Sequence, residues 1–162
     1  MQQYDLGLAD VPSDGPGVDI EPLMPLEFVC ALPNAHRLSN KPFLTAKDIV
    51  NEPLLMISPD SHQQPSIMKA LLAEKEELNV VFEASNSGPI CALVAEGAGL
   101  AIIDPLTTRD FRARGVTIRR FVPAVPYELK LIYPANRPRS ATSRAFTALI
   151  EQSLKSFNVA PD

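Results

Sequence analysis

The fold is decided by three short apolar runs, Leu54-Leu55-Met56-Ile57, Val80-Val81-Phe82-Glu83-Ala84 and Leu100-Ala101-Ile102-Ile103. Each run has the length and composition of a strand, and the first and third are apolar enough to be buried. A helical pattern follows each of them, at residues 66–78, 85–96 and 107–114. Strands that alternate with helices in this way predict a parallel sheet with helices on its faces and right-handed crossovers.

Further elements are expected on both sides of this region. Strand patterns occur at residues 4–9, 26–32 and 116–118, and a turn-rich loop is expected at 10–19. The alternation over 127–133 favours a half-exposed edge strand. Thr45 is suited to cap a short helix over 45–50, and the apolar spacing over 143–157 predicts a final helix that lies against another element.

Polar loops follow the three apolar strands. In parallel sheets, ligands bind outside the carboxyl ends of the strands, and free N–H groups at helix starts suit a carboxylate. An ammonium group would be matched by Asp60 or Asp104. The alternative is that these polar residues only cap the helices. The predicted ligand-binding residues are Ser58, Asp60, Ser61, His62, Ser85, Asn86, Ser87, Asp104, Pro105 and Thr107.

Composition excludes several classes of function. The chain has 162 residues and a net charge of −4, so it offers no basic surface for nucleic acid. It contains no apolar run of about 18 residues, the length of a membrane span. Cys30 and Cys91 lie inside apolar runs and are interpreted as two buried free thiols rather than a disulfide. We expect no metal site and no cofactor.

Catalytic motifs are weak. Asn86-Ser87-Gly88 lacks the first glycine of a nucleophile elbow, although Ser87 and His62 could pair, with Asp104 or Asp60 orienting the histidine. Gly97-Ala98-Gly99 stands after a helix and before a strand, the reverse of a dinucleotide fingerprint, and is better explained as a helix stop. We therefore predict a binding protein and not an enzyme, with a small serine hydrolase as a minor alternative.

Four segments in order resemble the effector-binding domain of LysR-type transcriptional regulators. These segments are Tyr4-Asp5-Leu6-Gly7-Leu8-Ala9, Glu21-Pro22-Leu23 followed by residues 28–38, Leu44-Thr45-Ala46-Lys47-Asp48-Ile49, and Val94-Ala95-Glu96-Gly97-Ala98-Gly99-Leu100 with residues 101–105. The stretches Ile90-Cys91-Ala92-Leu93-Val94 and Arg119-Arg120-Phe121 are similar to the branch of lysine and opine regulators.

The resemblance implies an α/β fold of the type 2 periplasmic-binding-protein kind, with two lobes and the ligand in the cleft between them. One lobe would be complete at residues 34–122. The other would be discontinuous, at 1–33 and 123–162, and would lack its opening units. The family's helix-turn-helix domain, which contacts DNA, does not appear before Tyr4.

The resulting hypothesis is a ligand-sensing module of a bacterial transcription regulator. Its effector would be a small amino-acid-like or opine-like carboxylate that alters the conformation of the regulator. The full-length protein would form dimers or tetramers and would bind DNA only through the helix-turn-helix domain. A solute-binding protein of the same fold is the alternative, but residues 1–5 do not resemble a secretory signal, so we expect a cytoplasmic protein without membrane contact.

Overall fold

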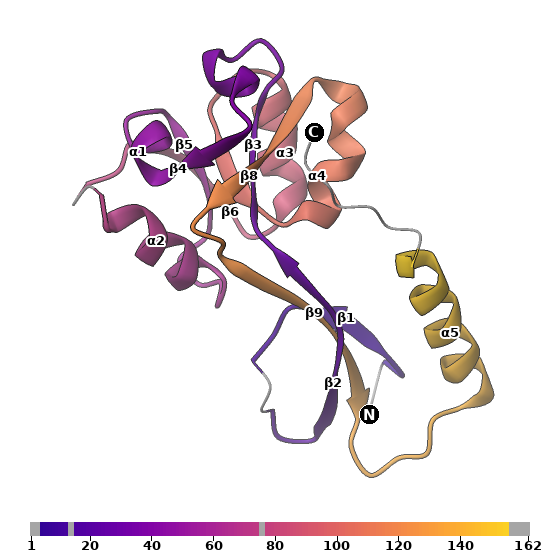
Figure 1. Ribbon diagram of the computed structural model, residues 1–162. Helices are drawn as coiled ribbons and strands as arrows, with labels where there is room; N and C mark the ends of the chain where they lie inside the picture. Colours follow the sequence, from indigo (N-terminus) through magenta and orange to yellow (C-terminus); the bar gives the residue numbers. More distant parts are fainter. Residues whose placement is uncertain (1–3, 13–14, 75–76, 156–162) are drawn as a thin grey trace. The chain divides into compact units, whose positions relative to one another are not determined.

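A computed structural model describes residues 4–12, 15–74 and 77–155 of the chain (Figure 1). Its strands and helices confirm the α/β class. Residue contacts divide the described chain into two compact units, residues 4–26 with 128–155 and residues 27–127. These divisions lie several residues from the lobe limits expected from the sequence, 33/34 and 122/123. No described helix is long and apolar enough to cross a membrane.

The unit of residues 27–127 is built on a mixed sheet. Its four-stranded part has the order β4 (Phe43–Thr45), β8 (Val116–Val122), β3 (Val29–Pro33), β7 (Ala101–Ile103). β3 is antiparallel to both β8 and β7, whereas β4 is parallel to β8. β7 therefore has an antiparallel neighbour, β3, which lies outside the stretch of residues 50–115 from which the parallel sheet was predicted.

The three apolar runs are nevertheless parallel to one another, as predicted. β5 (Leu54–Ile57) pairs in parallel with β6 (Val80–Ala84). Leu54 forms a parallel bridge with Leu100, supported by the hydrogen bonds from Leu55 N to Leu100 O at 2.8 Å and from Leu100 N to Pro53 O at 2.9 Å. The bridge joins the β5–β6 pair to the end of the four-stranded sheet.

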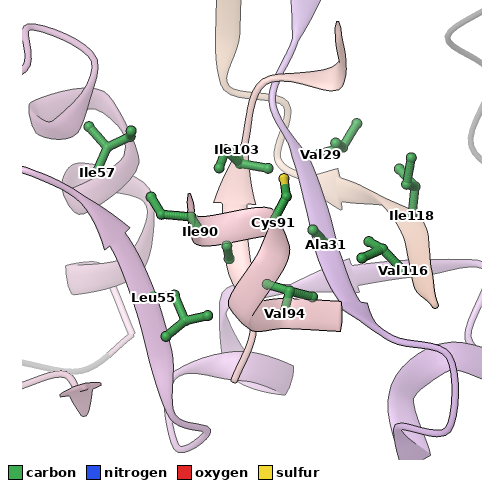
Figure 2. Close-up of a cluster of buried hydrophobic side chains, with 11 residues drawn as sticks. Val29, Ala31, Leu55, Ile57, Ile90, Cys91, Val94, Ile103, Val116 and Ile118 are labelled. Carbon is green, nitrogen blue, oxygen red and sulfur yellow. The ribbon is translucent and has the colours of Figure 1, made fainter. Parts of the chain in front are cut away.

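Helix α3 (Ser87–Ala95) supplies the centre of the core in this unit. Ile90, Cys91 and Val94 recur at helical spacing and are fully buried, so one face of the helix is apolar. Figure 2 shows these side chains directed toward residues from several strands. The strand residues of the cluster are Val29, Ala31, Leu55, Ile57, Ala101, Ile103, Val116 and Ile118.

Two glycines after α3 have different roles. Gly97 adopts a left-handed φ of 82° and its N–H donates to Val94 O at 3.0 Å, which ends the helix as predicted. Gly99 lies where β7 approaches β5, and a Cβ at this position would stand 2.5 Å from Pro53 O. Gly97 therefore terminates the helix, whereas Gly99 permits close contact between two backbones.

The short helix α1 (Ala46–Ile49) begins with a reciprocal cap. The N–H and the hydroxyl of Thr45 both donate to Asp48 Oδ2 at 2.9 Å, and Lys41 Nζ donates to the same carboxylate group. Burial acts to raise the pKa of Asp48, but the hydrogen bonds from Lys41 and Thr45 outweigh it and hold this pKa below its usual value. The predicted role of Thr45 as N-cap is confirmed.

Replacing Asp48 with asparagine should lower the free energy of unfolding by about 1 kcal/mol at pH 7, because the cap loses its charged acceptor. A lowered pKa in the folded state means that Asp48 stabilises the fold above its unfolded pKa and that this contribution is lost as pH falls through the folded value. The difference between wild type and Asp48→Asn in urea unfolding should therefore shrink at acid pH. Asp110→Asn, at an exposed position of α4 (Pro105–Phe111), is the control. A difference that is independent of pH would contradict this account.

Both cysteines are free and buried, as predicted. Burial raises the pKa of the Cys30 and Cys91 thiols to about 12, with smaller contributions from the charges of Asp48 and Asp104. Because the thiolate is the reactive form, both sulfurs are protected chemically as well as sterically.

We expect neither thiol to react with Ellman's reagent at pH 8 in the folded protein, and two thiols per chain to react in denaturant without reductant. The burial of both side chains and their raised pKa values are the reasons. Absorbance at 412 nm follows the reaction, and an added surface cysteine at Ser66→Cys is the reactive control. Rapid labelling of Cys30 or Cys91 in the folded protein would contradict the result.

The second unit contains a three-stranded sheet in the order β1 (Gly7–Ala9), β9 (Pro126–Pro134), β2 (Val18–Glu27), together with helix α5 (Ala141–Lys155). β9 is the middle strand, so the expectation of an edge strand is wrong. Tyr127, Leu129, Leu131 and Tyr133 are buried on one face as predicted, but Lys130 on the other face is buried as well. The pattern of β2 is not that of a strand because Pro22 and Pro25 interrupt it. Prolines are tolerated on edge strands such as β2. The expected loop over 10–19 ends at Gly17, and the last two residues of the expected helix over 143–157 lie outside the described residues.

Two other boundaries differ from those expected. Helix α2 (Gln64–Leu72) buries Ile67 and Leu71 but does not reach Leu78. The expected strand over 26–32 is interrupted at Phe28, between β2 and β3.

Candidate functional site

Three polar loops lie at one edge of the sheet. Ile57 and Ala84 are partners at the ends of β5 and β6, and Ser58 N donates to Ala84 O at 2.8 Å just beyond them. The parallel bridge between Leu54 and Leu100 brings the end of β7 to the same edge. The sequence prediction that the three loops share one edge is therefore confirmed.

The first loop, residues 58–62, is a hydrogen-bonded turn that leads into α2. Ser61 N donates to Ser58 O at 2.9 Å, and Ser61 Oγ accepts from Gln63 N at 3.3 Å. Asp60 and His62 are exposed, whereas Ser58 and Ser61 are half-buried. Ser61 thus supports the turn, and Asp60 and His62 are the residues of this loop whose side chains are most accessible to a ligand.

The second loop ends at the start of α3. Asn86 is the N-cap residue, with an extended backbone, and its side chain makes no capping hydrogen bond. Ser87 and Gly88 are the first helical residues, so their N–H groups precede the first intrahelical bond. Ser85 and Asn86 are exposed and Ser87 is half-buried. This helix start therefore offers accessible donors and positive partial charge to a carboxylate.

The third loop caps the helix that follows it. Asp104 is only 6% exposed, and its Oδ1 accepts from Thr107 N at 2.8 Å as the N-cap of α4. The Thr108 hydroxyl donates to the carbonyls of Asp104 and Pro105 at 3.2 and 3.1 Å. Asp104 therefore acts as a helix cap, and Pro105 is buried beside it.

The unit of residues 27–127 also contains a cavity away from the three loops. This cavity of about 750 Å³ is bounded by the start of α1, one face of α2 and residues 122–126. Its walls are mostly apolar, with Lys47 Nζ 3.8 Å from Glu74 Oε2 at the rim. The described residues of the three loops are not among its lining. The sequence did not predict it, although Ser66 and Ala70 on α2 and Ala73 just after the helix are small residues that leave open space.

Metal binding finds no support in the part of the chain that the structure describes, because no three His, Cys, Asp or Glu side chains come together there. Ser87, the nucleophile of the hydrolase alternative, is the first residue of α3. Asp104, one of the two carboxylates considered for that alternative, is engaged by the α4 cap.

Comparison with known proteins identifies relatives along almost the whole chain. The profile of the family described as "LysR substrate binding domain" matches residues 1–155. The transcriptional activator protein LysR of Escherichia coli K12 is 34% identical over 155 residues, covering 94% of this chain and 49% of that protein. The regulatory protein NocR of Agrobacterium tumefaciens T37 is also 34% identical over 155 residues, covering 96% and 52%. The chain thus spans about half the length of these curated relatives.

Solved structures show the same fold. HinK, a LysR family transcriptional regulator from Pseudomonas aeruginosa, aligns with a TM-score of 0.72 at 20% identity, covering 93% of this chain and 53% of that one. The regulatory domain of MetR, a LysR family regulator from N. meningitidis, aligns with a TM-score of 0.68 at 20% identity, covering 98% and 75%.

Proposed function

Because the chain belongs to the LysR substrate-binding domain family, we propose that it senses a small amino-acid-like or opine-like carboxylate. The observation that supports this most directly is the start of α3 at the shared edge of β5, β6 and β7. The Ser87 hydroxyl and the first N–H groups of the helix would bind the carboxylate. Asp60, exposed in the neighbouring loop, would bind the ammonium group.

The proposal assigns unequal weight to the predicted site residues. Ser85, Asn86 and Ser87 would provide the anion side of the site, and Ser58, Ser61 and His62 would shape the neighbouring loop. Asp104, Pro105 and Thr107 would act indirectly, by holding the third loop through the α4 cap. Within a longer regulator, ligand binding would stabilise one conformation over another and so affect DNA binding by a separate helix-turn-helix domain and self-association. The two lobes at 34–122 and at 1–33 with 123–162 are likewise part of this proposal.

A thermal-shift panel of lysine, arginine, glutamate and opines tests the ligand class. One of these ligands should stabilise the chain by RT ln(1 + [L]/Kd), about 4 kcal/mol at a thousandfold excess over Kd. Ser87→Ala should weaken that ligand about tenfold, through the loss of a hydrogen bond to a charged group, without changing the unliganded Tm.

Ser66→Ala is the matched control, because Ser66 lines the 750 Å³ cavity and not the three loops. Selective weakening by Ser66→Ala would place the ligand in the cavity and contradict the loop site. No response to any ligand of the panel would refute the proposed ligand class. Ester or amide turnover abolished by Ser87→Ala would instead support the hydrolase alternative.

A further inference from the structure

Helix α5 begins after the run Arg137-Pro138-Arg139-Ser140. Ser140 Oγ accepts from Ser143 N at 3.0 Å, and Ser140 O accepts from Arg144 N at 3.1 Å. The N–H groups of Ala141 and Thr142 precede this first intrahelical bond. The start of a helix of 15 residues therefore presents backbone donors and positive partial charge at this point.

The capping of α5 accounts for the N–H of Ser143 but not for its buried hydroxyl group. The residue is 7% exposed, and its buried hydroxyl oxygen has no hydrogen-bond partner among the residues that the structure describes. Its N–H is satisfied by Ser140, but its side chain is not. Buried hydroxyl groups are nearly always hydrogen-bonded, so the Ser143 hydroxyl is a donor that an acceptor entering the adjoining space could use.

A small cavity adjoins Ser143. Its volume of about 10 Å³ is that of one water-sized group. An acceptor that fits must therefore place a single atom inside and keep the remainder of the molecule outside. The cavity is lined by Asp5, Tyr133, Pro134, Arg137, Pro138, Arg139, Ser140 and Ser143.

The two arginines that line the cavity differ in how firmly their side chains are held by other residues. Arg139 is held by a hydrogen bond to Glu21, and its guanidinium carbon lies 3.5 Å from the centroid of the Tyr133 ring. Within the described residues Arg137 makes a loose ion pair with Asp5, at 3.9 Å, and the two side chains are 59% and 72% exposed. Exposed pairs of this kind are weak, so Arg137 can turn toward another anion.

We propose that the start of α5 binds a small oxyanion, with one oxygen in the cavity accepting a hydrogen bond from the Ser143 hydroxyl. The N–H groups of Ala141 and Thr142 and the Arg137 guanidinium complete the coordination. Carboxylate, phosphate and sulfate share this chemistry. The site lies within the unit of residues 4–26 and 128–155, so it is independent of the effector site proposed at the three loops.

Amide NMR of the ¹⁵N-labelled 162-residue chain tests this proposal. Phosphate, sulfate and acetate are titrated at constant ionic strength, with chloride as the exchanged anion. Saturable shifts are expected at the amides of Ala141, Thr142 and Ser143. Arg137→Ala should weaken binding about tenfold, and Ser143→Ala about fivefold, without loss of folding because that hydroxyl has no partner to lose.

Arg120→Ala is the matched control, because Arg120 is 60% exposed and makes an equally loose pair with Glu27 at 3.9 Å in the other unit. It should change the Kd by less than twofold. The order of affinity among phosphate, sulfate and acetate identifies which oxyanion is preferred. The proposal is overturned by absence of saturation with all three anions, by equal weakening in Arg120→Ala, or by unchanged binding in Ser143→Ala.

Discussion

Replacing Gly99 with alanine should lower the free energy of unfolding by about 3 kcal/mol. The added Cβ would stand 2.5 Å from the oxygen and 3.1 Å from the carbonyl carbon of Pro53. Both atoms belong to backbone, so relief requires β7 to move away from β5. That movement would weaken the hydrogen bond from Leu100 N to Pro53 O, which joins the two parts of the sheet.

Gly97→Ala is the control for this substitution. Gly97 has a left-handed φ of 82°, but a Cβ there would meet no atom within 4 Å. Its cost should be about 1 kcal/mol, from backbone strain alone. Urea unfolding followed by circular dichroism gives both values. If Gly99→Ala lowers the free energy of unfolding no more than Gly97→Ala does, a clash between the added Cβ and Pro53 is not the cause.

Ile90→Ala should lower the free energy of unfolding by about 4 kcal/mol. Ile90 is fully buried in the cluster that joins α3 to the strands (Figure 2). Truncation removes apolar contacts and leaves a hollow that the surrounding strands can fill only in part. Val81→Ala is the comparison, because Val81 is 51% exposed on β6 and should change stability by less than about 1 kcal/mol.

The measurement is the same urea titration, with the slope of the transition compared between variants. An unchanged slope together with a lower midpoint is the expected signature of lost packing. A loss for Ile90→Ala as small as that for Val81→Ala would show that α3 does not supply the centre of this core.

Local pattern was sufficient for the elements that are strongly apolar or clearly capped. The runs at Leu54, Val80 and Leu100 gave parallel strands, and Thr45 and Gly97 marked a helix start and a helix end. The runs at Leu54 and Leu100 are buried and the two helix caps are local in sequence, and composition records both kinds of signal directly. The run at Val80 also forms a parallel strand, although Val80, Val81 and Phe82 are exposed.

Pairing between distant strands could not be predicted in the same way. β9 lies between β1 and β2, which are more than a hundred residues away in the sequence. β7 lies beside β3, which is about seventy residues away. An alternating pattern shows which face of a strand is buried but not which strands are its neighbours. Pro22 and Pro25 further obscured β2.

The candidate site was predicted to the level of loops but not of individual side chains. That three polar loops meet at one edge follows from the rule for parallel strands. The Asp104 side chain accepts the capping hydrogen bond of α4, whereas the Asn86 side chain makes no capping hydrogen bond to α3. Residue spacing does not predict which polar side chain forms such a bond. The 750 Å³ cavity escaped prediction because distant segments, α1, α2 and residues 122–126, enclose it.

The burial of Cys30 and Cys91 has a consequence for how this chain meets oxidants. These residues are its only two cysteines, and both stand inside the folded unit of residues 27–127. A peroxide or a disulfide-exchange partner attacks the thiolate and needs access to the sulfur. Oxidants therefore find no reactive thiol until the unit of residues 27–127 opens, so this unit should keep its fold and both thiols in oxidising as well as reducing surroundings.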